Sequence, residues 1–303
     1  MILKLIPFVF VLLWASGFIG ARLGLEYAEP ATLLTIRMVS NVGFFLLLVV
    51  LLKRKIPRGI EFFHSFVVGM LIHGFYLGGS YLAIGWGMPA GLSSLLVGLQ
   101  PILTALLIVG FTVERFKFSQ WLGLALGFIG ICLVLIGDIE WQNDDHKLIA
   151  FGACMLALVG ITFGTLYQKR YCKGVDMVGS ALVQYLAAGM LFLPAALQYE
   201  TMQVQWTMEF ILTMVWLVVV LSCVAILLLL YMVENGAASS VASVFYMVPP
   251  VTAIQAWLMF GESFDALGAL GFCLAAIAVY LVVKNPQFRL GKKEVVHVKV
   301  SQQ

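Results

Sequence analysis

SSVASVFYMVPPVTAIQAWLMFGE (Ser239–Glu262) is an apolar run with a proline near its middle and a glutamate at its end. The stretch AGLSSLLVGLQPILTALLIVGFTVE (Ala90–Glu114) has the same plan. An offset of 148 residues relates the two prolines, Pro101 and Pro249, and also the two final glutamates. The chain therefore contains an internal repeat, and these two stretches fix how its halves align.

The same offset pairs Arg22 with Arg170 and Thr104 with Thr252. Proline removes a backbone donor from a helix, and in lipid the freed carbonyl needs protein, water or a ligand beside it. Proline-interrupted spans at matching places in two halves favour a transport site. The alternative is that both prolines are ordinary kinks, which membrane helices tolerate.

The composition indicates an all-α, polytopic membrane protein. Of the 303 residues, 62% are hydrophobic and 11% are charged, whereas soluble domains have roughly 45–50% and about 25%. A membrane-spanning helix needs about 20 apolar residues. Ten stretches qualify, at residues 3–22, 31–52, 63–86, 90–110, 118–137, 148–169, 177–198, 208–233, 238–260 and 265–284. Because nine spans follow the first, we expect span 1 to be retained rather than cleaved as a signal peptide.

The distribution of basic residues predicts the orientation of the spans. With the spans alternating, 15 of the 18 Lys and Arg residues fall on one side, which the positive-inside rule makes cytoplasmic, with both termini. Five spans per half is an odd number, so the two halves have inverted topology. We expect a first repeat at 1–137, an external linker at 138–147, a second repeat at 148–284 and a basic cytoplasmic tail at 285–303.

The chain resembles the drug/metabolite transporter superfamily, EamA type. The resemblance lies in the ten spans, the elements Gln100–Glu114 and Pro249–Glu262, the Gly-rich span after each, and Leu13–Ser16 in span 1. It covers residues 3 to 284. It implies alternating-access movement of a small metabolite across the cytoplasmic (inner) membrane, often amino-acid export, through a cavity between spans 1, 3, 4, 6, 8 and 9.

Polar side chains inside spans are costly and mark candidate sites. In span 3, His73, Tyr76 and Ser80 share one helical stripe, beside Tyr81. Spans 4 and 9 carry similar stripes, which include Gln100, Thr104, Ser243 and Tyr246. We interpret these side chains as the polar wall of a cavity. The alternative is that they only make hydrogen bonds between helices.

Aromatic pairs four residues apart, Trp14 with Phe18 and Phe163 with Tyr167, are candidate walls for an apolar or cationic solute group, or ordinary packing residues.

Arg37 could pair with Glu26 or Glu29, or could capture a substrate carboxylate. Together with Arg37, Glu114 and Glu262 are candidates for gates or helix caps. Candidate hinges lie at Pro101, Pro249 and Pro250.

No Asp or Glu lies in the central part of any span, so we expect facilitated diffusion or exchange without an obligatory ion. The alternative is a proton-coupled antiporter in which His73 carries the proton. The sequence lacks H-E-x-x-H and G-x-S-x-G, so an intramembrane enzyme is disfavoured, as is a channel.

We expect no cofactor, no bound metal and no nucleic acid. The expected partners are a small-molecule metabolite and membrane lipid, for a monomer or a homodimer.

Overall fold

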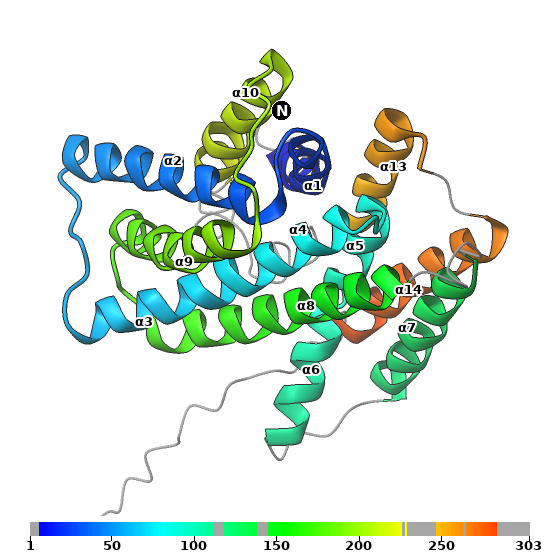
Figure 1. Cartoon of the computed structure of the whole chain (residues 1–303). Coiled ribbons are helices and arrows are strands. Elements are labelled where there is room, and N and C mark those ends of the chain that lie inside the picture. Colours follow the sequence, from blue (N-terminus) through cyan, green and yellow to red (C-terminus); the bar gives the residue numbers. More distant parts are fainter. Residues whose placement is uncertain are drawn as a thin grey trace, which may run out of the picture.

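The computed structural model describes residues 6–111, 118–137, 145–225, 228, 247–262 and 265–283. Within these ranges every regular element is a helix, apart from one isolated β-bridge between Ala28 and Val204 (Figure 1). The helices of the first half are α1 (Ile6–Leu25), α2 (Pro30–Leu51), α3 (Ile60–Val68), η2 (Gly69–Tyr76), α4 (Leu77–Gly85), α5 (Ala90–Val97), α6 (Gln100–Phe111) and α7 (Phe118–Gly137). Those of the second half are α8 (Asp145–Tyr171), α9 (Met177–Tyr199), α10 (Met208–Val215), η4 (Trp216–Ala225), α13 (Val248–Phe260) and α14 (Ala266–Val283).

Six helical segments of the described chain are long and apolar enough to cross a membrane. They are Ile6–Leu25, Pro30–Leu51, Ile60–Gly85, His146–Tyr171, Met177–Tyr199 and Met208–Ala225. Four shorter apolar helices are Ala90–Thr104, Trp121–Val134, Val248–Phe260 and Ala266–Ala278. The expected all-α, multi-pass architecture is therefore confirmed, and a helix lies inside each expected span. The number of ten crossings stays a prediction.

The helices are apolar on their outward faces. In α2, Val39, Leu47 and Val50 are more than half exposed, and the same holds for Phe128 in α7 and Leu197 in α9. Side chains of this kind belong in lipid rather than water, because soluble proteins rarely expose such continuous apolar surface. The surface thus has the character that a multi-pass membrane protein requires.

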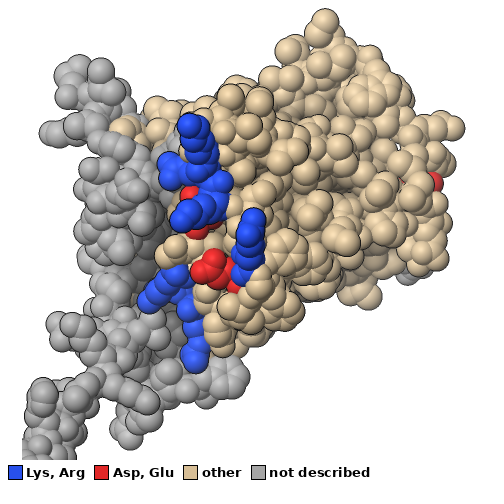
Figure 2. Space-filling model, turned by 90° about the vertical axis from the view of Figure 1, so that its left-hand side faces the viewer, with Lys and Arg blue, Asp and Glu red and all other residues tan. Residues whose placement is uncertain are grey.

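Charged side chains gather at one end of the molecule, beside a broad surface without charge (Figure 2). The exposed basic residues among those described at this end are Lys53, Arg54, Lys55, Arg58, Lys169, Arg170 and Lys173. Their two loops lie side by side, since Arg54 Nη1 is 3.8 Å from the Asp176 carboxylate. We call this the basic end and the opposite end the outer end. The outer end joins residues 26–29 to residues 200–207, where Gln205 N donates to Tyr27 O at 3.0 Å.

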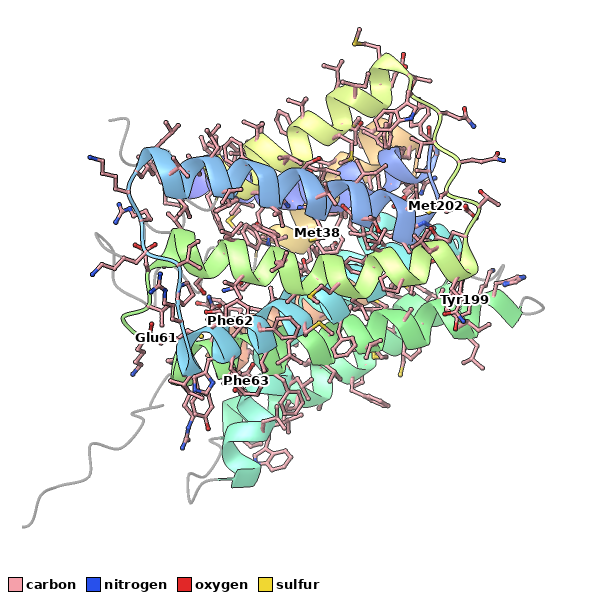
Figure 3. The ribbon with its side chains drawn as sticks, turned by 60° about the vertical axis from the view of Figure 1, so that its left-hand side comes forward. Met38, Glu61, Phe62, Phe63, Tyr199 and Met202 are labelled. Carbon is pink, nitrogen blue, oxygen red and sulfur yellow. The ribbon has the colours of Figure 1, made fainter. Side chains whose placement is uncertain are left out.

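Figure 3 relates these two ends to the core. It shows Glu61, Phe62 and Phe63 at the basic end, Tyr199 and Met202 at the outer end, and Met38 between α2 and α9. Met38 is fully buried, whereas Tyr199 is 78% exposed. Helices α2 and α9 therefore run from one end of the molecule to the other, along its apolar surface.

Small residues let the helices approach closely. A Cβ added to Gly160 would lie 2.9 Å from Leu71 O, where α8 meets η2. Between α7 and α14, a Cβ on Gly130 would lie 2.8 Å from Ala275 N. Small residues such as Gly160 and Gly130 are thus used for packing between helices inside the chain.

Three irregularities interrupt the described parts of the spans. The first is η2 in span 3 and the second is η4 in span 8, and both are π-helical. The third is the corner between α5 and α6, where the helix stops at Val97 and resumes at Gln100. π-Helical turns are uncommon and concentrate near functional sites. All three irregularities lie in spans that the family resemblance assigns to the cavity.

Candidate functional site

The buried face of α2 carries polar side chains among its apolar core residues, whereas its exposed face is largely apolar. Arg37 is 8% exposed, and Asn41, one turn further on, is completely buried. Residues four apart share one face of a helix, so both side chains point into the bundle. Polar side chains turned inward, such as Arg37 and Asn41, are expected where spans surround a polar site.

Arg37 reaches α4. Its Nη1 donates a hydrogen bond of 2.7 Å to the hydroxyl of Tyr81, which is 2% exposed. Arg37 also lies close enough to His73, Tyr76 and Tyr185 to act on each electrostatically. The expected polar stripe of span 3 is therefore gathered around a guanidinium from span 2. Ser80, beside Tyr81 in α4, is 3% exposed, and its hydroxyl has no hydrogen-bond partner among the described residues.

Helix α9 supplies the other side of this group. The Tyr185 ring lies 4.5 Å from the His73 ring and 5.2 Å from the Phe45 ring, measured between centroids. Next to it, Gln184 Nε2 donates to Ser180 Oγ at 3.0 Å, and Ser180 Oγ donates to Ser65 Oγ at 2.9 Å. This chain of hydrogen bonds fixes α9 against α3 beside His73.

The structure brings together four of the expected site residues and separates others. His73 and Tyr76 lie on η2, which packs against α9, and the buried Ser80 and Tyr81 lie on α4, which packs against α2. The residues that the sequence reasoning missed are Asn41, Gln184 and Tyr185. The available signal was simple: each is a polar residue well inside an apolar span, and Asn41 is four positions from Arg37.

The two aromatic pairs lie in different surroundings. Phe18 is 6% exposed and belongs to the main apolar core, and Trp14 packs beside it. Phe163 is 44% exposed, as are Leu156 and Val159 at similar levels on the same side of α8, whereas Gly160 and Gly164 meet η2. The place of Phe163 in a cavity wall stays a prediction.

Tyr167 lies at the basic end rather than in the centre. Its hydroxyl is 2.8 Å from His64 Nδ1, and its ring centroid is 4.6 Å from that of Tyr171. The His64 ring stacks on Tyr171 at 4.8 Å. Tyr167 therefore belongs to an aromatic cluster with His64 and Tyr171, and the wall expected from Phe163 and Tyr167 stays a prediction.

The proline helices meet each other. Pro101 is the second residue of α6, and Pro249 and Pro250 lie in the first turn of α13. Proline costs little at a helix start, since the N–H that it lacks has no partner there. A Cβ on Gly98, at the corner between α5 and α6, would lie 2.6 Å from Pro249 Cγ. The two repeat-related prolines thus begin helices rather than kink their interiors.

Two polar residues of span 4 were expected beside this corner. Gln100 Nε2 donates to Thr165 Oγ1 of α8 at 2.9 Å, so it makes the hydrogen bond between helices that was the alternative reading. Thr104 is partly buried one turn further along α6. Its repeat counterpart, Thr252, donates to Val248 O at 2.9 Å. These residues lie at helix contacts next to the proline corner.

Acidic residues close the outer end. Glu262 pairs with Arg22, and its carboxylate also accepts from Ala90 N at 3.1 Å and Gly91 N at 3.2 Å, so it caps α5. Its side chain is 9% exposed. Negative charge at a helix N-terminus is favourable because the first N–H groups have no partner within the helix. The Glu262 carboxylate, from the second half of the chain, therefore binds both α1 and α5 of the first half.

Two further carboxylates act in the same way. Glu200 accepts from the N–H groups of Ala31 and Thr32, both at 2.7 Å, at the start of α2. Glu29 accepts from Thr201 N at 2.7 Å and from the Thr201 hydroxyl. Neither Glu26 nor Glu29 forms the expected ion pair with Arg37, since the described ion pairs are Arg22–Glu262 and Arg54–Asp176. Glu26 instead lines a hollow of about 350 Å³ at the outer end.

Three candidate residues, Glu114, Ser243 and Tyr246, lie outside the described residues.

Comparisons with known proteins agree with this architecture. The sequence profile of the EamA-like transporter family matches residues 2–136 and 148–284. The chain is 28% identical over 267 residues to "Uncharacterized transporter YdfC" of Bacillus subtilis (strain 168), which covers 86% of this chain and 83% of that protein. It is 24% identical over 287 residues to "Uncharacterized inner membrane transporter YedA" of Escherichia coli (strain K12), with 91% and 88% covered.

A further relative carries a more specific name. The chain is 25% identical over 294 residues to "Probable amino-acid metabolite efflux pump" of Escherichia coli (strain K12), covering 93% of this chain and 95% of that protein. A solved structure titled "Crystal structure of protein" superposes with a TM-score of 0.62 at 13% identity, covering 93% of this chain and 98% of that one. At this identity the superposition supports the fold alone.

Proposed function

Because the chain belongs to the EamA-like transporter family, we propose that it moves a small metabolite across the cytoplasmic membrane by alternating access. The solute that fits best is an amino acid or a similar amphipathic molecule, in export or exchange. The observation that carries this proposal is the polar and aromatic group around Arg37 in the interior of a bundle with an apolar surface. The named efflux function of one relative supports the solute class.

Helix packing supports two inverted halves. Helix α1 packs against η4 and α13, and the counterparts at the 148-residue offset also meet, since α8 packs against η2 and α6. Between α7 and α14, a Cβ on Gly127 would lie 3.3 Å from Ala278 Cβ. The counterpart pair, Gly130 and Ala275, is also in contact. Each contact of the first half thus has a counterpart in which the two halves have changed places. A pseudo-two-fold axis in the membrane plane requires such paired contacts.

We propose that Arg22 and Glu262 form an outer gate. The offset pairs them with Arg170 and Glu114, which would form the corresponding gate at the basic end. Inverted halves exchange roles between the two access states, so one gate closes as the other opens. The bend would occur at the proline corner, where Pro101, Pro249 and Pro250 begin their helices beside Gly98. The aromatic and polar residues of spans 1, 3 and 4 would contact the solute.

Exchange of labelled solutes by purified protein in liposomes tests this function. We expect counterflow of a labelled amino acid, and we expect it to persist with a proton uncoupler. The physical reason is that the described carboxylates lie in loops or at helix ends, and a proton on His73 would place a second positive charge near Arg37. Loss of exchange both with the uncoupler and in His73→Ala would instead favour the proton-coupled antiporter.

Cysteine labelling tests the orientation. In a background without the five native cysteines, Gln203→Cys at the outer end should react with an impermeant maleimide added to intact cells. Lys173→Cys at the basic end should react only after the membrane is opened. Both positions are exposed, so any difference between them reports the side of the membrane rather than burial. The reverse pattern would place the termini outside the cytoplasm and contradict the proposed topology.

A further inference from the structure

Arg37 is a buried cation without a carboxylate partner among the described residues. Its Nη1 is held by the Tyr81 hydroxyl, but its Nε is buried and makes no hydrogen bond. The two carboxylates at the start of α2, Glu29 and Glu200, are held by other groups at the outer end. Because an uncompensated charge inside a protein is costly, a guanidinium kept in this position needs a reason.

The groups around Arg37 are also unsatisfied. Asn41 is completely buried, and neither its Nδ2 nor its Oδ1 has a hydrogen-bond partner among the described residues. The Tyr81 hydroxyl accepts from Arg37, which leaves its own proton available to a further acceptor. We call Arg37, Asn41 and Tyr81 the Arg37 cluster. Native proteins satisfy most buried polar atoms, so several unsatisfied atoms around one cation indicate a ligand site.

The chemistry of the cluster selects an anion. Arg37 Nε, Asn41 Nδ2 and the Tyr81 hydroxyl are all donors, and the guanidinium carries the positive charge. The edge of a guanidinium that includes Nε matches the two oxygens of a carboxylate, which it binds in a bidentate manner. Asn41 Oδ1 remains as an acceptor for an amino or hydroxyl group on the same solute. A cationic solute would find no described counter-charge here.

We infer that the Arg37 cluster binds the carboxylate group of the transported solute. This inference rests on the proposed transport function and adds the residues and the chemical group of the solute. It also adds spans 2 and 7 to the site: α2, in span 2, supplies the charge, and α9, in span 7, supplies the Tyr185 ring that packs on His73. The solute class is therefore carboxylates, which excludes polyamines and neutral nucleosides.

Counterflow with five labelled probes tests the solute class. The probes are phenylalanine, succinate, putrescine, uridine and inorganic phosphate. We expect exchange of phenylalanine or succinate, and we expect unlabelled phenylalaninamide not to compete with phenylalanine. Exchange of only putrescine, only uridine or only phosphate would overturn the inference and leave the transport function standing. Exchange of none of the five would overturn both.

Variants separate a binding role from a structural one. Arg37→Met keeps an unbranched stem that can fill the space of the arginine stem and removes the charge, so it should lower carboxylate exchange by about 100-fold or more. If Arg37 only binds solute, the variant should melt at a higher temperature than the parent, because an uncompensated buried charge has gone. A lower melting temperature with exchange retained would assign Arg37 a structural role and overturn the inference.

Asn41→Leu serves as the second variant should Arg37→Met fail to fold. It replaces two unsatisfied polar atoms by an apolar group of similar size, so the melting temperature should rise while the apparent affinity for the carboxylate falls. The matched control is Ser180→Ala, in which a buried hydroxyl that does have partners is removed. That control should melt at a lower temperature and keep its affinity. Equal behaviour of the two variants would count against the Arg37 cluster as a ligand site.

Discussion

Replacing Glu262 with glutamine is expected to open the outer end of the protein and to slow exchange. The carboxylate serves three donors, Arg22 and the N–H groups of Ala90 and Gly91. A glutamine has one acceptor oxygen, so its NH₂ group would face a donor. Removing one partner of a buried ion pair costs about 3–5 kcal/mol. Arg22 is 36% exposed, so we expect a smaller cost of about 1–3 kcal/mol.

A cost of this size shifts the ratio of open to closed states by about tenfold to 100-fold. Cysteine at position 94 can report the shift, because Ser94 is 2% exposed in α5 beyond the capped N-terminus. We expect faster labelling of Ser94→Cys from outside in Glu262→Gln than in its parent. Arg22→Gln should have a weaker effect, since the cap on α5 survives. Exposed Glu209, in the first turn of α10, supplies the control Glu209→Gln.

Unchanged labelling and unchanged exchange in Glu262→Gln would show that the ion pair is only a cap. The same labelling assay separates the gate from a general loss of stability, because Glu209→Gln reports the effect of removing an acid at the same end of the molecule. Salt would also weaken the Arg22–Glu262 ion pair, whereas the hydrogen bonds from Ala90 and Gly91 to Glu262 are less sensitive to salt.

Gly79→Ala is expected to destabilise the protein and abolish exchange. An added Cβ would collide with the Ala153 carbonyl oxygen and would lie 2.9 Å from Ala157 N, both backbone atoms of α8. Backbone cannot move aside as a flexible side chain can, so α4 and α8 must separate. Overpacking of this kind costs about 1–3 kcal/mol, and α4 carries Tyr81 of the Arg37 cluster.

The control is Gly152→Ala, in the neighbouring turn of α8. A Cβ there meets nothing within 4 Å, so alanine should stabilise the helix by about 1 kcal/mol through its higher helix propensity. Thermal unfolding in detergent and counterflow in liposomes measure both variants. Equal melting temperatures for the two variants would mean that the contact of Gly79 with α8 does not limit stability.

The helices could be predicted from the sequence, because apolar length and short polar connections identify membrane-spanning segments without any tertiary information. The ends of α2, for example, fall within one residue of the predicted span at 31–52. The cap that Glu200 provides for α2 could not be predicted, since 168 residues separate it from Thr32. Sequence periodicity carries no information about which distant carboxylate reaches a helix start.

The site was only partly predictable for a related reason. The stripe of span 3 identified His73 and Tyr81 correctly as inward-facing residues, because polar groups avoid lipid. Phe163 could not be assigned to one side from the sequence, because aromatic residues are equally at home in lipid and in a cavity wall, and their spacing alone does not choose between the two. The expected ion pair of Arg37 with Glu26 or Glu29 was wrong because proximity along the chain favoured those residues, whereas in the fold the guanidinium donates to Tyr81.

The π-helical segments η2 and η4 have a consequence for how relatives of this protein can differ in length. A π turn closes its hydrogen bond over five residues rather than four, so it holds one more residue than an α turn. Deleting one residue within Gly69–Tyr76 can therefore be absorbed by conversion of that segment to α-helix, with the flanking faces of the span unchanged. The same deletion in α2 would rotate everything beyond it by about 100° and turn one side of the helix toward lipid. A one-residue gap in an alignment of spans 3 or 8 is thus compatible with an identical fold.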